Sequence, residues 1–157
     1  MRYEREHGST KGDGMSDDNA ELLRRAWAAY DSGDFDAFAA CLTADWREYD
    51  GQGDVGTVED ERRTMELHRV AFPDKHTEIH RMISSEDLVA CHCTVTATHT
   101  GPYLGVKPTG KRVVIYEMMF NRVENGRLAE TWAVTEGGGF YQQLTGQPAP
   151  DDLDNMG

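Results

Sequence analysis

Apolar residues recur with helical spacing in the first half of the chain. Three helices are expected there: one that begins at Asp17, Asp18 or Asn19 and ends at Ser32, a short one that starts at Asp34, and one that opens at Thr57 or Glu59 and stops before Pro73. A brief strand at 46–50 separates the second helix from the third. The apolar face of the first helix comprises Leu22, Leu23, Ala26, Trp27 and Tyr30.

The second half of the chain has the composition of β-strands. Four strands are predicted at 75–83, 86–98, 111–123 and 127–135, and a last helical turn at 140–144 follows them. Asn125-Gly126 indicates a tight hairpin, because both residues tolerate positive φ. Helices first and strands afterwards, without βαβ alternation, predict an α+β fold in which helices cover one face of a curved antiparallel sheet. The hollow between the two layers is a natural place for a small molecule.

Alternation along the predicted strand at 111–123 places an ionisable residue among apolar ones. Ile115, Glu117, Met119 and Asn121 share one face of the strand. The opposite face is also half apolar, so both faces are expected to be covered. This predicts a homodimer that forms through the outer face of the sheet.

Composition sets the outer limits. The 157 residues suit one domain, expected at 18–146, between a disordered tail at 1–17 and a flexible acidic tail at 147–157. A net charge of −12 argues against nucleic acid as a partner, and no apolar run predicts a membrane span or a signal peptide. A cytoplasmic location is therefore expected.

The cysteines Cys41, Cys91 and Cys93 match neither a disulfide framework nor a zinc pattern.

Several short motifs, taken in order from Asn19 to Gly146, resemble the nuclear transport factor 2-like superfamily and, within it, the SnoaL-like polyketide cyclases. They are Tyr-Asp-Ser-Gly-Asp-Phe at 30–35, Phe72-Pro73-Asp74, Thr98-His99-Thr100-Gly101, Pro108-Thr109-Gly110-Lys111, Arg-Val-Glu-Asn-Gly-Arg at 122–127, and Glu130-Thr131-Trp132. The resemblance implies a cone-shaped α+β barrel around a central pocket, usually a homodimer. It also implies ring closure by acid/base chemistry without a metal or cofactor.

That chemistry requires a carboxyl group whose pKa burial raises toward neutrality. Asp50 stands where the related ketosteroid isomerases carry their general base; its alternative is a turn residue before Gly51. Glu136 lies four residues after Trp132, where cyclase-like members often show an aspartate; its alternative is a carboxylate at the start of the following helical turn.

Two further residues are candidates for proton transfer. His99 opens the Thr-His-x-Gly segment and would relay a proton or bind a substrate carbonyl; alternatively it fixes the loop at 100–110. Glu117 would act as acid or base if it faces inward, because an ionisable group inside a strand is seldom buried without a partner or function. If it faces outward, it would pair at an interface with a residue such as Arg112 or His92.

Substrate contacts are expected from aromatic residues and one methionine. Met119 occupies the position where ketosteroid isomerases place a protonated aspartate, so an isomerase oxyanion hole is not expected. The pocket-lining candidates are Tyr49, Trp132, Trp27 and Tyr30; ordinary core packing is the alternative for each of them.

The resulting hypothesis is a cofactor-independent cyclase of a polyketide-type secondary metabolite. The alternatives are a related pocket enzyme (an isomerase, an epoxide hydrolase or a pericyclic cyclase) and a small-molecule-binding dimer without catalysis. Epoxide hydrolysis in related folds uses an Asp-Arg-Asp group, for which the sequence shows no inward arginine.

Overall fold

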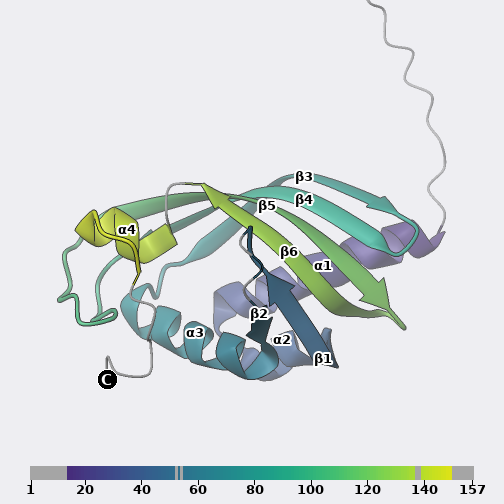
Figure 1. The fold of residues 1–157 in the computed structure, drawn as a ribbon, viewed down its shortest axis with the longest axis horizontal. Helices are drawn as coiled ribbons and strands as arrows, with labels where there is room; N and C mark the ends of the chain where they lie inside the picture. Colours follow the sequence, from purple (N-terminus) through teal and green to yellow (C-terminus); the bar gives the residue numbers. More distant parts are fainter. Residues whose placement is uncertain (1–13, 52, 54, 137–138, 150–157) are drawn as a thin grey trace, which may run out of the picture.

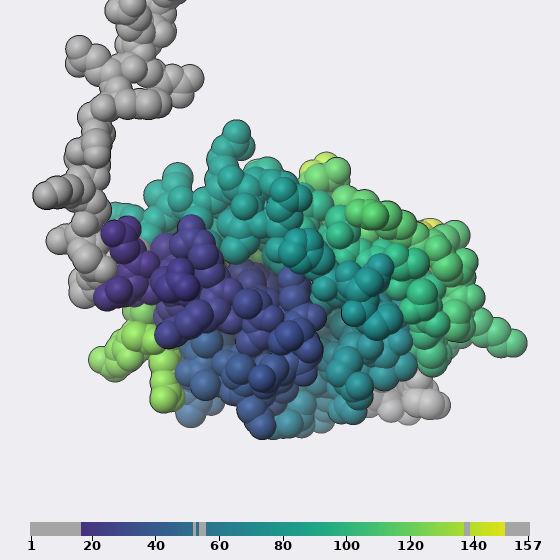
Figure 2. All heavy atoms as spheres, turned by 180° about the vertical axis from the view of Figure 1, so that it is seen from behind, coloured from purple at the N-terminus to yellow at the C-terminus, as the bar shows by residue number. Residues whose placement is uncertain are grey.

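The computed structural model describes residues 14–51, 53, 55–136 and 139–149. Helices α1 (Gly14–Ser32), α2 (Phe35–Ala40) and α3 (Val58–Ala71) lie on one side of a curved sheet, and α4 (Gly139–Thr145) lies near one end of it (Figure 1). Seen from behind, the chain coloured purple to blue, which holds α1 and α2, covers one end of the molecule (Figure 2). The strands are β1 (Leu42–Tyr49), β2 (Val55–Thr57), β3 (His76–Ser85), β4 (Leu88–Thr98), β5 (Arg112–Glu124) and β6 (Arg127–Glu136).

The six strands form a single mixed sheet in the order β2-β1-β6-β5-β4-β3. The expected α+β plan, with helices packed on a curved sheet, is confirmed. The sheet is not wholly antiparallel, however, because β1 pairs with β6 in parallel. This pairing places a strand from the first half of the chain beside the last strand, and so joins the two halves into one core.

The structure also moves several predicted boundaries. Helix α1 begins at Gly14, inside the expected N-terminal tail, and the rest of that tail and residues 150–157 lie outside the described part. Strand β1 begins at Leu42, four residues before the predicted start, and β2 was not predicted. The third helix starts as expected, because Thr57 caps it in a capping box with Asp60. None of the described helices combines the length and apolar character that a bilayer span requires.

A β-bulge in β6 decides which of its side chains face the helices. Val123 pairs with Leu128 and Arg122 pairs with Glu130, so Ala129 is the extra residue. Leu128 and Ala129 are therefore both buried, and beyond the bulge it is Thr131 that is buried while Trp132 is exposed. The bulge reverses the inward and outward positions that strict alternation from Leu128 would give.

The loop after β4 is anchored to the end of α3. The backbone N–H groups of Thr100 and Gly101 donate to the Ala71 carbonyl over 2.9 and 3.2 Å. A side chain at 101 would collide with the carbonyl of Val70, which explains the glycine. His99 is fully buried here, and its Nδ1 lies 3.0 Å from the Thr109 hydroxyl and 3.3 Å from the Thr109 backbone nitrogen.

Candidate active site

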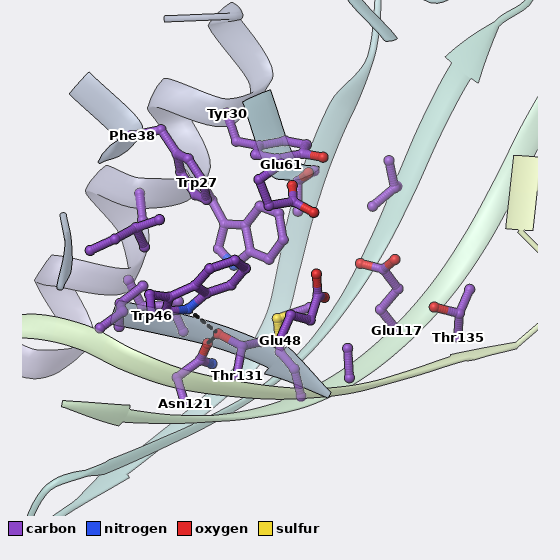
Figure 3. A pocket seen from close by; sticks show the side chains of 18 of the residues that line it. Trp27, Tyr30, Phe38, Trp46, Glu48, Glu61, Glu117, Asn121, Thr131 and Thr135 are labelled. Atoms are coloured by element: carbon purple, nitrogen blue, oxygen red, sulfur yellow. Dashed lines mark hydrogen bonds between the residues drawn. The ribbon is translucent and has the colours of Figure 1, made fainter. Parts of the chain in front are cut away.

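A cavity of about 130 Å³ lies between the helices and the inner face of the sheet. Its wall is mostly apolar and aromatic, as is usual for small-molecule sites. Its apolar lining includes Leu23 and Met119. Its aromatic lining includes Trp27, Tyr30, Phe38 and Trp46 (Figure 3).

Three glutamates from three separate elements point into this cavity (Figure 3). Glu48 follows Trp46 by two residues on β1, so both side chains face inward. Glu61 lies in the first turn of α3, just after the capping box. Glu117 lies in the middle of β5, opposite Cys93 on β4 and Thr135 on β6. The fold thus gathers carboxyl groups that are far apart in the sequence.

Burial strongly perturbs the first two carboxyl groups. Burial, followed by the nearby charge of Glu61, raises the pKa of Glu48 from 4.5 to about 8. Burial also raises the pKa of Glu61. The two side chains share a hydrogen bond, which requires a proton on one of them. This bond raises the pKa of Glu48 and lowers that of Glu61, which favours the proton on Glu48. Glu61 also accepts a hydrogen bond from Tyr30, whose own pKa is raised well above 10.0, chiefly by burial.

Glu117 is in a different electrostatic environment. Burial raises its pKa, but the positive charge of Lys75 opposes that rise. Hydrogen bonds from Thr135 and Cys93 also favour the ionised form; the Cys93 sulfur lies 3.9 Å from Glu117 Oε2. Glu117 is therefore the carboxyl with the better-stabilised negative charge, whereas Glu48 holds its proton.

A buried hydrogen-bond chain fixes the floor of the cavity (Figure 3). The Trp46 indole N–H donates to the Thr131 hydroxyl over 3.2 Å, and that hydroxyl donates to Asn121 Oδ1 over 2.9 Å. The Asn121 amide in turn donates to the Val89 carbonyl over 3.3 Å. Because every member has a partner, the chain holds Trp46 in one orientation beside Glu48.

Four of the residues proposed from the sequence line the cavity: Glu117, Met119, Trp27 and Tyr30. His99 does not line it. Its contacts with Thr109 match the alternative in which it fixes the loop, and burial lowers its pKa, which keeps the ring neutral.

The other four proposed residues lie away from the cavity. Asp50 and Glu136 are exposed, just after the end of β1 and at the end of β6. Tyr49 and Trp132 stack on each other with ring centroids 5.7 Å apart, and they follow the inward-facing Glu48 and Thr131. Trp132 and Glu136 lie on the outer face because the bulge at Ala129 turns them there. The register of β1 against β6 then pairs Tyr49 with Trp132.

Sequence reasoning missed Glu48 and Glu61. A signal for each exists in the sequence: Glu48 alternates with Trp46, and Glu61 lies four residues before the buried Met65 and seven before the buried His68 on α3. Neither position matches a family motif, which is why the prediction concentrated on Asp50 and Glu136. Among the described residues, no group of three His, Cys, Asp or Glu side chains is arranged to hold a metal ion.

A curved sheet, three covering helices and a cavity with several carboxyl groups define a small α+β pocket protein. The family model for SnoaL-like polyketide cyclases matches residues 20–144, and the chain belongs to this family.

Solved structures agree with this assignment. AclR from Streptomyces galilaeus, for which a hydroxylase activity has been suggested, superposes with a TM-score of 0.75 at 28% identity, covering 88% of this chain and 87% of that one. IdmH from Streptomyces antibioticus, suggested to be a polyketide cyclase, superposes with a TM-score of 0.69 at 23% identity, covering 80% of this chain and 97% of that one. A SnoaL-like protein from Jannaschia sp. CCS1 superposes with a TM-score of 0.74 at 18% identity, covering 90% of this chain and 99% of that one. No curated protein matches the chain.

The raised pKa of Glu48 predicts a pH-dependent stability effect. Between pH 4.5 and about 8 the folded protein binds more protons at Glu48 than the unfolded chain does, so rising pH destabilises the fold. Glu48→Gln removes this effect. Its stability relative to the wild type should therefore rise over that interval, on the order of a few kcal/mol, and stay constant below it. Urea unfolding at a series of pH values measures the difference.

Glu136→Gln is the matched control, because it changes an exposed glutamate and should show no such pH-dependent gain. Parallel pH curves for Glu48→Gln and the wild type would show that Glu48 titrates normally in the folded state.

Proposed function

We propose that this protein is a cyclase of a polyketide-type secondary metabolite, and that it closes a ring by acid/base catalysis without a cofactor. The observation that carries the proposal is the set of three carboxyl groups around one apolar cavity, in which Glu48 is held protonated and Glu117 lies under the influence of Lys75. Pairs of carboxyl groups whose environments separate their pKa values are typical of acid/base active sites. Membership of the cyclase family supports the same reaction class.

In this mechanism Glu117 is the general base. It removes a proton from a carbon between two carbonyl groups of the substrate, and the resulting enolate attacks a second carbonyl carbon in the same molecule. Negative charge then develops on the oxygen of that carbonyl. Glu48 donates its proton to this oxygen while Glu117 holds the proton taken from the substrate, so the number of negative charges among the three carboxyl groups stays the same. The aromatic wall holds the substrate in a folded shape in which the two carbons meet.

A hydroxylase is the second candidate, because AclR is the most sequence-similar of the three structures above. The two reactions differ in product mass. Aldol ring closure leaves the mass unchanged or removes one water, whereas hydroxylation adds an oxygen. The cavity lining contains no arginine, so the described residues give no support to an Asp-Arg-Asp epoxide hydrolase site.

Glu117→Gln should lower turnover about a hundredfold or more, because the amide cannot accept the substrate proton. Turnover is measured as conversion of linear poly-β-ketone substrates, with products identified by mass spectrometry and NMR. Glu48→Gln should also lower turnover.

Asp50→Asn and Glu136→Gln change exposed carboxyl groups outside the cavity and should retain most turnover. The reverse pattern, with full activity in Glu117→Gln and loss in one of these two, would place the base at a strand end. A product heavier by one oxygen would favour the hydroxylase.

We further propose that the protein is a homodimer that forms through the outer face of the sheet. A row of side chains in register crosses five strands and comprises Ile83, Ala90, Phe120, Trp132 and Tyr49. Phe120 is 57% exposed, and its neighbours Met118 and Val134 are each 63% exposed. A contiguous apolar face of this kind is typical of a subunit interface.

Phe120→Glu should convert the dimer into a monomer of 17.6 kDa, because a second copy would have to bury the new charge. Light scattering coupled to size-exclusion chromatography measures the mass. Val70→Glu, which changes an exposed apolar residue on α3, should leave the dimer intact. A wild-type protein that is monomeric at high micromolar concentration would contradict the proposal.

A further inference from the structure

A lysine in the cavity wall is not used by the acid/base mechanism except as a charge. Lys75 lies between the end of α3 and the start of β3, and only 7% of its side chain is exposed. Its Nζ lies 3.5 Å from the centre of the Tyr30 ring. A lysine is rarely buried without a partner or a function.

Within the part of the chain that the structure describes, the ion pair of Lys75 is long. Nζ lies 4.0 Å from Asp31 Oδ1, at the outer limit for such a contact. The Asp31 carboxylate is already engaged, since it accepts hydrogen bonds from the Thr77 backbone N–H over 2.6 Å and from the Thr77 hydroxyl over 2.8 Å. Asp31 is therefore fixed by Thr77 and does not hold the amine in a tight salt bridge.

Lys75 also lies where two chambers adjoin. A second cavity of about 90 Å³ shares Tyr30, His68 and Lys75 with the main one. The amine thus stands in a wall common to both spaces, on the same cavity as Glu61 and Glu117. A substrate in the main cavity would have this amine and two proton-transfer groups around it.

Burial makes the amine more nucleophilic than an exposed one. It lowers the pKa of Lys75 from 10.5 to about 8, against the opposing charges of Asp31 from α1, Glu61 from α3 and Glu117 from β5. His68, the other basic group in the shared wall, stays neutral because burial lowers its pKa to about 3. The free amine of Lys75 therefore exists at pH values where exposed lysines are almost wholly protonated.

We propose that Lys75 captures a ketone or aldehyde carbon of the substrate as a Schiff base. The Nζ lone pair attacks the carbonyl carbon, the nitrogen then loses one of its N–H protons, and the carbonyl oxygen takes up a proton to give a neutral carbinolamine. A second proton transfer to this oxygen releases it as water, while the nitrogen lone pair forms the C=N bond. Glu61 and Glu117 are the groups placed to carry these protons.

Capture deepens the proposed function and rests on it for the ring-closing step. The iminium nitrogen withdraws electrons, so the neighbouring C–H becomes more acidic and Glu117 removes its proton more easily. The enamine then attacks the second carbonyl, and water releases the ring product and regenerates the amine. The iminium carries the same positive charge as the ammonium group, so Glu117 has a cationic neighbour when it removes the C–H proton.

Acetylacetone is the probe for this reaction. It is a small 1,3-dicarbonyl that condenses with a free amine to a stable conjugated enaminone, with loss of one water and without a reductant. The chain has four lysines, at 11, 75, 107 and 111, so peptide mapping by mass spectrometry assigns every adduct. Lys107 and Lys111 belong to exposed residues and serve as internal references in the same sample.

The folded wild-type protein near pH 7 should form the adduct on Lys75 at least about tenfold faster than on Lys107 or Lys111, because a lowered pKa gives a larger free-amine fraction. The rate at Lys75 should rise with pH and level off above about pH 8. Lys75→Arg keeps the charge and should abolish the fast adduct, and Lys107→Arg should leave it unchanged. Circular dichroism of the treated protein confirms that the adduct forms on the folded state.

Reaction at Lys75 no faster than at Lys107 and Lys111 would overturn the inference, and this outcome is read from the wild type even if Lys75→Arg fails to fold. A fast Lys75 adduct that appears only together with loss of the circular dichroism signal would overturn it as well. Absence of the adduct, with turnover still dependent on Glu117, rejects capture alone. A fast adduct with full turnover in Glu117→Gln rejects the ring-closing mechanism instead.

Discussion

The removal of carboxyl groups from water is the constraint on which the site depends. Glu48, Glu61 and Glu117 share one cavity, and burial raises the pKa of each. Three buried negative charges would repel one another strongly, so the arrangement is tolerable only if protons are retained or a cation is supplied. The hydrogen bond between Glu48 and Glu61 retains a proton, and Lys75 supplies the cation. These two interactions leave Glu48 as the acid and Glu117 as the base.

The sheet supplies the geometry that this electrostatic arrangement needs. The parallel pairing of β1 with β6 brings Glu48 to the face that also carries Glu117, and the bulge at Ala129 turns Thr131 inward. Thr131 then links Trp46 to Asn121, which fixes the cavity floor. The same bulge turns Trp132 outward, where it stacks on Tyr49 and extends the apolar outer face. One irregularity in a strand thus shapes both the pocket and the surface proposed for the dimer.

The sequence was sufficient for the order of helices and strands, because helical periodicity, the cap at Thr57 and the Asn125-Gly126 turn are all local signals. It also placed Glu117, Met119, Trp27 and Tyr30 on the inner side, where simple alternation or helical spacing holds. It could not place Trp132 or Glu136, because a bulge is a property of strand pairing and leaves no mark in a single strand. Glu48 and Glu61 were missed for a related reason: strand alternation and helical spacing place each on an inner face, but only the fold shows that the two carboxyl groups meet.

The central claim, that a carboxyl group in the cavity keeps its proton at neutral pH, is tested most directly by a ¹³C NMR titration of the glutamate side-chain carboxyl groups in the folded protein. A proton retained on Glu48 should give one carboxyl resonance that titrates near pH 8 and disappears from the spectrum of Glu48→Gln. A titration in which every glutamate carboxyl resonance has its midpoint close to the ordinary value of 4.5 would contradict it.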